Sequence, residues 1–227
     1  IYAGMKDDFM VEFDRFLEIE RGLPATWFFV PFASEAGLNG GAAAPSRRAV
    51  KYTLDQVAPE IKKLRAAGCE IGVHGIDAWR DGKKGALERE RISEASGKGG
   101  EGVRMHWLYC DESTPRNLEE AGYLYDATVG YNEAIGYRAG TSQVYRPLSA
   151  GRLLELPMNV MDSALFYPDR MNLTERQAAE AVNALIHGSI QRGGTLTINW
   201  HHRSLGPERY WDEFYINLVK DLKARNA

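Results

Sequence analysis

Three histidines of this sequence, His74, His106 and His201, each stand at or near the end of an apolar, strand-like run. His74 is followed three residues later by the carboxylate of Asp77. An imidazole and a carboxylate at one strand end can bind a divalent metal, or they can form a base with its orienting partner. A strand-capping histidine and a helix-capping aspartate would explain the same two residues equally well.

The three strand ends matter together, because the carboxyl ends of parallel strands converge on one pocket in an α/β barrel. The set suits metal-assisted hydrolysis, in which a metal activates water, a carboxylate takes a proton and an imidazole protonates the leaving group. Arg104 lies two residues before His106, so both side chains share a face if their strand is regular. Its guanidinium could fix a catalytic carboxylate or hold an anionic substrate group through two hydrogen bonds.

Strand-like and helix-like patterns alternate along the chain, which predicts a single parallel-stranded α/β domain over residues 1–227. The loop 33–49 is rich in glycine, alanine and serine. A first helix carries Phe9, Phe13, Phe16 and Leu17 on one face, with Asp7 or Asp8 as its cap. Further helices are expected at 55–67, 86–95, 113–122 and 175–191. A last helix is expected from Pro207, with Tyr210 on its inward face. Strands are expected at 25–30, 71–74, 103–108, 124–127, 136–138, 153–156 and 195–200.

The composition is that of a folded globular protein: 44% of the 227 residues are hydrophobic, enough for a sizeable core. A net charge of −3 gives no electrostatic footprint for nucleic acid. No stretch approaches the ~20 apolar residues of a membrane span, and no segment reads as a secretory signal. Cys69 and Cys110 lack a metal-type spacing, and Cys69 is interpreted as a buried thiol. The missing signal and disulfide pattern favour the cytoplasm.

Four segments, taken in order, resemble the polysaccharide deacetylase (NodB-homology) family: the strand 25–30, the strand to His74, Gly102-Val103-Arg104, and the strand to His201. The motifs His-Gly-Ile-Asp-Ala-Trp, Arg-Met-His-Trp-Leu and Gly-Tyr-Arg-Ala-Gly-Thr resemble members that act in bacterial surface-polysaccharide or O-antigen assembly. The resemblance covers most of the chain. It implies a distorted (β/α) barrel of about seven strands, and metal-dependent removal of an N-acyl group from an amino sugar. The metal it implies is Zn²⁺, with Co²⁺ or Ni²⁺ as alternatives.

Matched position by position, His74 corresponds to the first metal-binding histidine of the family's His-x-x-x-His motif. Arg104 corresponds to the arginine that orients the catalytic aspartate, and His201 to the general-acid histidine. The second motif histidine falls at Ala78, which cannot ligate a metal. Asn199 takes the place of an aliphatic residue that belongs to the acyl-methyl pocket.

A further departure concerns the family's first strand, whose acidic motif supplies the general base and one metal-ligating aspartate. No such strand is expected before the first helix, where Asp7 and Asp8 read as caps, so either the strand lies upstream or the base is missing. His106 is then the favoured replacement metal ligand, because an imidazole suits zinc. Asp77 is the candidate base or supporting carboxylate.

Several residues beside these positions are candidates for substrate binding. Trp79 and Trp107 could stack on a sugar, whereas Trp27 and Trp211 are expected in the core. Arg138 lies between small residues and could bind a substrate anion or form a buried ion pair.

Other charged residues have structural interpretations. Asp126 could pair with Arg104 or Arg138. Asp162 could belong to the site or cap the turn that follows it, and the cap is favoured. His187, late in a helix, is expected to be an ordinary surface or core histidine.

Two functions remain open. The first is a metal-dependent amidase that removes an N-acetyl or N-formyl group from an amino sugar. The second is a catalytically weakened relative that binds carbohydrate without turnover. The lost second histidine and the missing acidic motif favour the second function, and the joint presence of His74, Arg104 and His201 favours the first.

Overall fold

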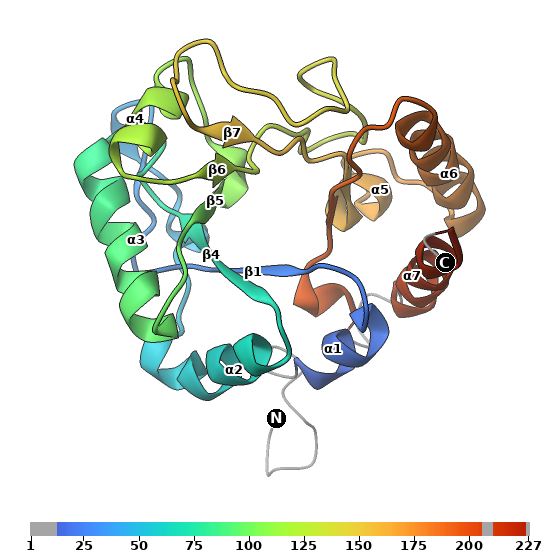
Figure 1. Cartoon of the computed structure of the whole chain (residues 1–227), viewed down its shortest axis with the longest axis horizontal. Coiled ribbons are helices and arrows are strands. Elements are labelled where there is room, and N and C mark those ends of the chain that lie inside the picture. Colours follow the sequence, from blue (N-terminus) through green and yellow to red (C-terminus); the bar gives the residue numbers. More distant parts are fainter. Residues whose placement is uncertain (1–12, 206–210, 226–227) are drawn as a thin grey trace.

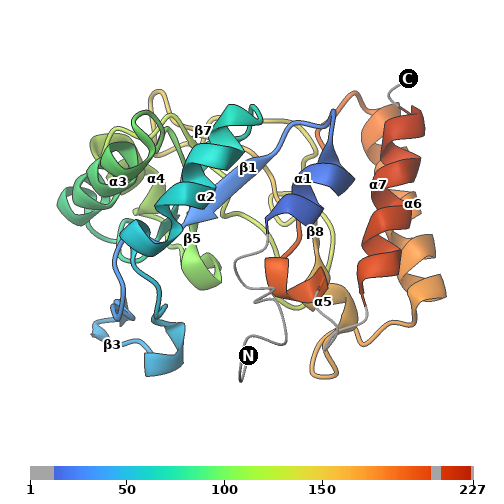
Figure 2. The same ribbon diagram turned by 90° about the horizontal axis from the view of Figure 1, so that it is seen from below.

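The structure is a computed structural model that describes residues 13–205 and 211–225. Its helices surround a central group of strands, so that the strands lie inside a ring of helices (Figure 1). The segment between residues 33 and 50 projects from this ring (Figure 2). None of the described helices is long and apolar enough to cross a membrane.

The strands form a parallel central sheet. Five strands pair in the order β1 (Thr26–Phe29), β4 (Glu70–Gly75), β5 (Gly102–Met105), β6 (Tyr125–Asp126) and β7 (Leu154–Glu155). A second parallel pair is β8 (Val160–Met161) with β9 (Ile198–Asn199), and β2 (Leu38–Asn39) pairs antiparallel with β3 (Ala42–Ala43). The α/β class with a parallel sheet is therefore confirmed.

The helices follow the strands as a (β/α) pattern requires. Their bounds are α1 (Asp14–Glu20), α2 (Leu54–Ala66), α3 (Gly82–Ser96), α4 (Thr114–Glu120), α5 (Asp162–Phe166), α6 (Glu175–Gln191) and α7 (Asp212–Arg225). Short 3-10 turns are η2 (Ser46–Arg48), η3 (His106–Leu108) and η4 (His202–Leu205). A capping box of Thr174 and Gln177 begins α6 and satisfies amides that the helix itself leaves unpaired.

The packing around β4 shows why this strand is central. Ile71 and Val73 are buried in the main core, and α2 covers them with the apolar face that includes Ile61 and Leu64. Gly72 pairs in register with Phe28, and a Cβ at Gly72 would lie 2.6 Å from the Phe28 ring. The absence of a side chain there lets β1 and β4 pack closely.

A second core lies around β8 and β9, between α5, α6 and α7. It contains Val160, Phe166, Val182 and Phe214 among its buried residues. Trp211 packs on Phe166 at the edge of this cluster, with ring centroids 4.9 Å apart. Trp27 packs against Phe13 and Phe16 in the first half of the molecule, so both tryptophans expected in the core contact it.

Three strand predictions were wrong in extent. The predicted strand 103–108 ends at Met105, because the next residues turn into η3. No strand forms at 136–138, where the Gly136 amide bonds to the Asn159 carbonyl at 2.8 Å. Within 195–200 only Ile198–Asn199 pairs as a strand, since the Thr197 amide bonds to the side chain of Asn159. The residues named as first-helix caps, Asp7 and Asp8, together with Phe9, Pro207 and Tyr210, lie outside the described residues.

Two buried carboxyls lie side by side where β6 pairs with β7. Asp126 and Glu155 are register partners, exposed by 2% and 1%. Thr128 donates a hydrogen bond to Asp126, and the Val129 amide donates one of 2.9 Å to Glu155. Burial raises the pKa of both carboxyls, and the charge of Asp126 raises the pKa of Glu155 further. Glu155 is therefore protonated at neutral pH, while Asp126 accepts its hydrogen bond.

This raised pKa predicts that the free energy of unfolding falls as the pH rises. The folded state keeps the proton of Glu155, whereas the unfolded chain releases it above its ordinary value of 4.5. The Glu155→Gln variant keeps the oxygen acceptor and cannot ionise, so it should lose less stability than the native chain between about pH 6 and 9. Chemical denaturation across this range measures the difference. Glu94→Gln, at a side chain that is 62% exposed, is the control, and equal slopes for E155Q and the native chain would contradict the assignment.

Candidate active site

β4 delivers His74 to its carboxyl end, opposite Arg104 of β5 in the strand register. The Nδ1 atom of His74 lies 2.9 Å from the carbonyl oxygen of Arg104. A carbonyl oxygen only accepts hydrogen bonds, so Nδ1 carries the ring proton and Nε2 keeps its lone pair. This is the tautomer in which an imidazole can ligate a metal through Nε2.

His106 reaches the same place through a turn. Its ring centroid lies 4.7 Å from that of His74, although His106 begins η3 and is not part of β5. Trp107 and Leu108 follow with φ angles of 65° and 55°, in the left-handed region. Such a conformation costs a non-glycine residue about 1–3 kcal/mol. Contacts elsewhere must therefore hold this turn, and strain of this kind clusters at functional sites.

The protonation of His74 reflects its surroundings. Burial lowers its pKa well below 6.5, and the charge of His106 lowers it further. The hydrogen bond to the Arg104 carbonyl opposes this shift, whereas the charges of Arg104 and His201 add to it. His74 is therefore neutral at neutral pH, as metal ligation requires. The interaction with both other histidines places His74, His106 and His201 in one region of the protein.

His201 follows β9 and is held by Asp162, which follows the neighbouring strand β8. Its Nδ1 lies 2.6 Å from Asp162 Oδ1, and its amide donates a bond of 2.9 Å to Oδ2. Ser204 also donates to this carboxylate. Burial would raise the pKa of Asp162, but attraction to His201 and these hydrogen bonds outweigh it, and the net pKa is lowered. The carboxylate is fully buried, whereas 32% of the His201 side chain is exposed, so the imidazole faces outward from a fixed anion.

Of the two roles that the sequence leaves open for Asp162, the turn cap was favoured. Oδ1 does accept the Ser163 amide at 2.6 Å, but the carboxylate also pairs with His201, a partner that the sequence analysis did not name. A signal was present, because Asp162 directly follows an apolar strand, as His201 does. Two polar residues at the carboxyl ends of adjacent parallel strands lie close together.

Arg104 joins the two sheets. Its Nε donates to the Ala127 carbonyl at 3.1 Å and its Nη1 to Asn199 Oδ1 at 2.9 Å. Burial lowers the pKa of Arg104 to about 10, so the guanidinium is still charged at neutral pH. Within the described residues it forms no ion pair with a carboxylate, and the predicted pairing with Asp126 is absent.

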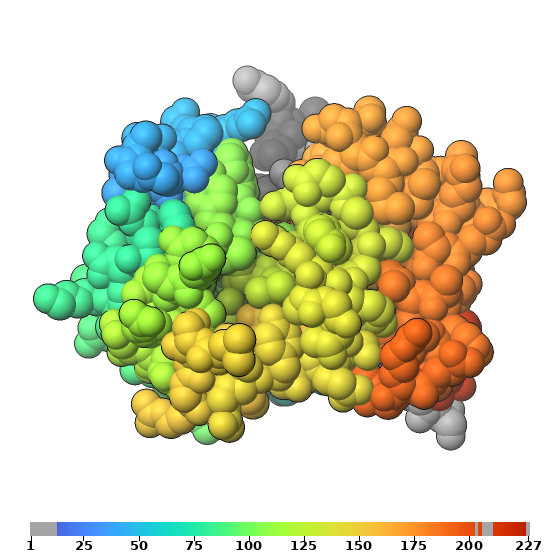
Figure 3. All heavy atoms as spheres, turned by 90° about the horizontal axis from the view of Figure 1, so that it is seen from above, coloured from blue at the N-terminus to red at the C-terminus, as the bar shows by residue number. Residues whose placement is uncertain are grey.

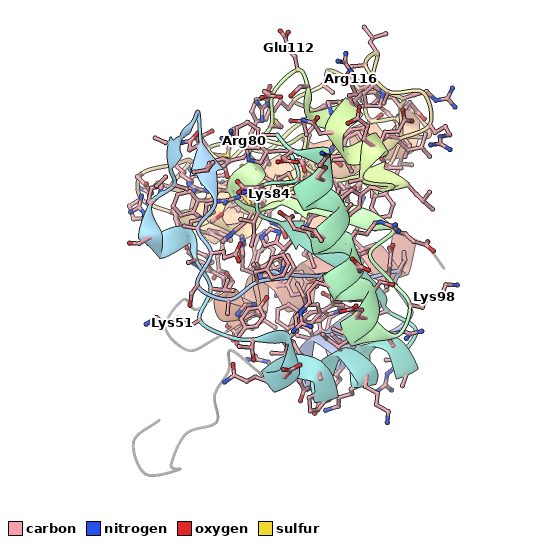
Figure 4. All side chains as sticks on the ribbon, turned by 90° about the vertical axis from the view of Figure 1, so that its left-hand side faces the viewer. Lys51, Arg80, Lys84, Lys98, Glu112 and Arg116 are labelled. Atoms are coloured by element: carbon pink, nitrogen blue, oxygen red, sulfur yellow. The ribbon has the colours of Figure 1, made fainter. Side chains whose placement is uncertain are left out.

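Asp77 does not face the histidines as a base would. Its Oδ1 accepts the Leu38 amide at 2.9 Å, and its Oδ2 binds Lys84 Nζ at 2.7 Å. Lys84 lies at the start of α3, on the side of the projecting 33–50 segment (Figure 4). These contacts tie Asp77 to α3 and to the β2–β3 hairpin, so they do not support the predicted catalytic role. Ala78 is fully buried beside it.

The residues predicted to bind substrate differ in their exposure to solvent. Trp107 is partly exposed, and the guanidinium of Arg47 lies 5.4 Å above its ring. Trp79 is 8% exposed and belongs to the main core, which corrects its assignment as a sugar-stacking residue. Arg138 is exposed and donates to the Gly130 carbonyl at 3.1 Å, so it is not in a buried ion pair. His187 is exposed on α6, where it bonds to Gln191, as an ordinary surface histidine does.

The fold of this chain is found in known structures. Over 94% of this chain and 71% of the other, the structure superimposes on a protein from Mycobacterium smegmatis described as a polysaccharide deacetylase, with a TM-score of 0.63 and 22% identity. The fold is that of the polysaccharide deacetylases. A probable polysaccharide deacetylase from Pseudomonas aeruginosa PAO1 matches with a TM-score of 0.53 and 17% identity, over 75% of this chain and 58% of that one. The Puue allantoinase matches at 0.56 and 18%, over 76% of this chain and 59% of that one. No family model and no curated protein matches the sequence.

The bond from Asp162 to His201 predicts the tautomer of this histidine in the deacetylase fold. The carboxylate should keep the neutral ring protonated at Nδ1, because it accepts but cannot donate. In Asp162→Asn the side-chain amide can also donate, so the ring should shift toward the Nε2–H form. Nitrogen chemical shifts of the histidine rings measure this, with exposed His187 as the internal reference. An unchanged His201 tautomer in D162N would contradict the assigned role of Asp162.

Proposed function

We propose that this protein hydrolyses the N-acyl group, an N-acetyl group in the first instance, of an amino sugar in a bacterial surface polysaccharide or its precursor. The observation that carries the proposal is the His201–Asp162 pair in the same region as the imidazoles of His74 and His106, whose ring centroids lie 4.7 Å apart. The pair supplies an oriented acid–base group, and the imidazoles supply donors of the type that zinc prefers. The deacetylase fold of the chain supports this combination.

The proposal includes a bound metal ion, so the side chains present must be suitable donors for it. His74, with Nδ1 bonded to a carbonyl, can offer Nε2, and His106 lies beside it. Catalytic zinc sites commonly have about three protein ligands, and within the described residues no group of three or more His, Cys, Asp or Glu side chains could hold a metal. The two imidazoles thus fit Zn²⁺ in kind but not in number. A bound divalent ion would polarise the amide carbonyl and lower the pKa of a water.

The chain's own residues account for the departure of the amine. Hydrolysis adds water across the C–N bond, so the sugar nitrogen must gain a proton as that bond breaks. His201, protonated at Nε2, can donate this proton while Asp162 stabilises the imidazolium through Nδ1. The partly exposed ring of Trp107 can pack on the apolar face of the sugar. Arg104 contributes a buried positive charge beside Asn199.

A carbohydrate-binding protein without turnover is the second candidate. Ala78 provides no second motif ligand, and Asp77 is engaged by Lys84. A pocket could then retain its shape and its aromatic surface while it lacks a base. This candidate predicts that glycan binds and that a chelator does not change the binding.

The enzyme proposal predicts release of acetate from N-acetylglucosamine oligomers when Zn²⁺ or Co²⁺ is added. His74→Ala should abolish both metal binding and release. His201→Ala should keep metal binding and lower turnover by about 10²–10⁴-fold, the usual contribution of a general acid. Acetate assays combined with calorimetric titration of the metal separate these effects.

His187→Ala is the matched control, since this histidine is exposed on α6. It should behave as the native chain does. Glycan binding without acetate release at any metal concentration would overturn the enzyme proposal in favour of the binding protein.

A further inference from the structure

Arg48 is a buried cation that is held by backbone carbonyls. Only 1% of the residue is exposed, and it lies in η2, just after the β2–β3 hairpin. Its guanidinium donates to the carbonyls of Ala36, Ile76 and His106. Within the described residues it forms no ion pair with a carboxylate. A buried charge is costly unless its hydrogen bonds are satisfied, so these three carbonyls are what keeps Arg48 in place.

Two of the three bonded carbonyls directly follow the ends of neighbouring strands. Ile76 follows the end of β4, two residues after His74, and its carbonyl accepts from Nη2 at 3.0 Å. The His106 carbonyl accepts from the same Nη2 at 2.8 Å and from Nε at 3.3 Å. The planar guanidinium of Arg48 thus connects the backbone just after His74 with the backbone of His106 itself. A guanidinium suits this task, because its donors are fixed in one plane.

The His106 turn needs such a support. Trp107 and Leu108 are left-handed, so the backbone leaves β5 in a conformation that it would not keep without restraints. Arg48 holds the carbonyl before Trp107, and Asn132 donates to the carbonyl of Trp107 itself at 3.2 Å. The Arg48 guanidinium also lies 4.5 Å from the ring centroid of Tyr109, directly after the turn.

The segment that carries Arg48 reaches this turn from outside the ring of helices. In the space-filling view the segment around residues 33–48, coloured blue, lies against the green segment that follows β5 (Figure 3). On the opposite side of the Ile76 peptide, Glu88 accepts the amides of Ile76 and Asp77 at 2.9 and 2.8 Å. The β4 end is therefore fixed from two sides, and Arg48 connects it to the His106 turn.

We propose that Arg48 is a positioning residue that sets the place of the His106 imidazole against His74. Its hydrogen bonds reach the backbone carbonyls of Ile76 and His106, so it acts through the backbone of the turn. Its effect on chemistry rests on the proposed function, but its effect on the two histidines does not. The projecting 33–50 segment is then a part of the site's support.

The first test uses the metal-free full chain. In native protein the rings of His74 and His106 should show a nuclear Overhauser contact, as their 4.7 Å separation requires. Arg48→Lys and Arg48→Met should weaken or abolish this contact and speed amide exchange at residues 106–109. The His201 ring signals should not move. Arg89→Lys is the matched control. Arg89 lies on α3, and its Nε also donates a hydrogen bond to a backbone carbonyl, that of Ala121.

The second test measures Co²⁺ affinity by calorimetry and by the visible spectrum of the bound ion. Loss of a group that supports a metal ligand commonly weakens binding by about 10–100-fold, so Arg48→Lys should bind Co²⁺ at least about tenfold more weakly, and Arg89→Lys should match the native chain. If the native chain binds no Co²⁺, the metal proposal fails and the ring contact still decides the role of Arg48. An unchanged ring contact in both Arg48 variants, with their secondary structure intact, would overturn the inference. If Arg48→Lys does not fold, Arg48→Met, which buries no charge, provides the comparison.

Discussion

The parallel pairing of β4 with β5 is the constraint on which the rest of the site depends. It places His74 opposite Arg104 and allows one hydrogen bond, from His74 Nδ1 to the Arg104 carbonyl, to fix the tautomer of the imidazole. The same pairing brings the chain after β5 to the end of β4, where the His106 ring meets His74. Gly72 contributes from the other side, because its missing side chain lets β1 pack against β4. A shift of this register by one residue would turn His74 to the opposite face of the sheet.

The two halves of the molecule contribute different chemistry. In the half that contains the five-stranded sheet, β4 carries the imidazole of His74, and the turn after β5 carries that of His106, with ring centroids 4.7 Å apart. The β8–β9 pair provides an imidazole with its own buried carboxylate, which favours acid–base work. Arg104 of β5 donates to Asn199 of β9, so one buried side chain connects the two sheets. The polar side chain of Asn199 is explained by this bond, since an aliphatic residue there would leave a buried guanidinium donor without its partner.

Regular parts of the fold could be predicted from the sequence, and irregular parts could not. The α6 helix was predicted with its bounds because its capping box and apolar face act locally. The strand ending at His74 was predicted because a short apolar run bounded by glycine indicates a buried strand. The end of β5 was missed, because the left-handed turn at Trp107 is held by Arg48 and Asn132, which come from distant segments. No local pattern records such long-range contacts.

The same reasoning explains which candidate site residues could be named from the sequence. Histidines at strand ends are visible, because few other features place a titratable ring there. Aspartates are ambiguous, since Asp77 and Asp162 both follow apolar strands and both accept backbone amides. Their tertiary contacts distinguish them. Asp77 binds a lysine of the helix that follows it, whereas Asp162 bonds to a histidine almost forty residues away. An aspartate becomes part of an acid–base pair through the strand beside it, and strand adjacency in a barrel is set by the whole fold.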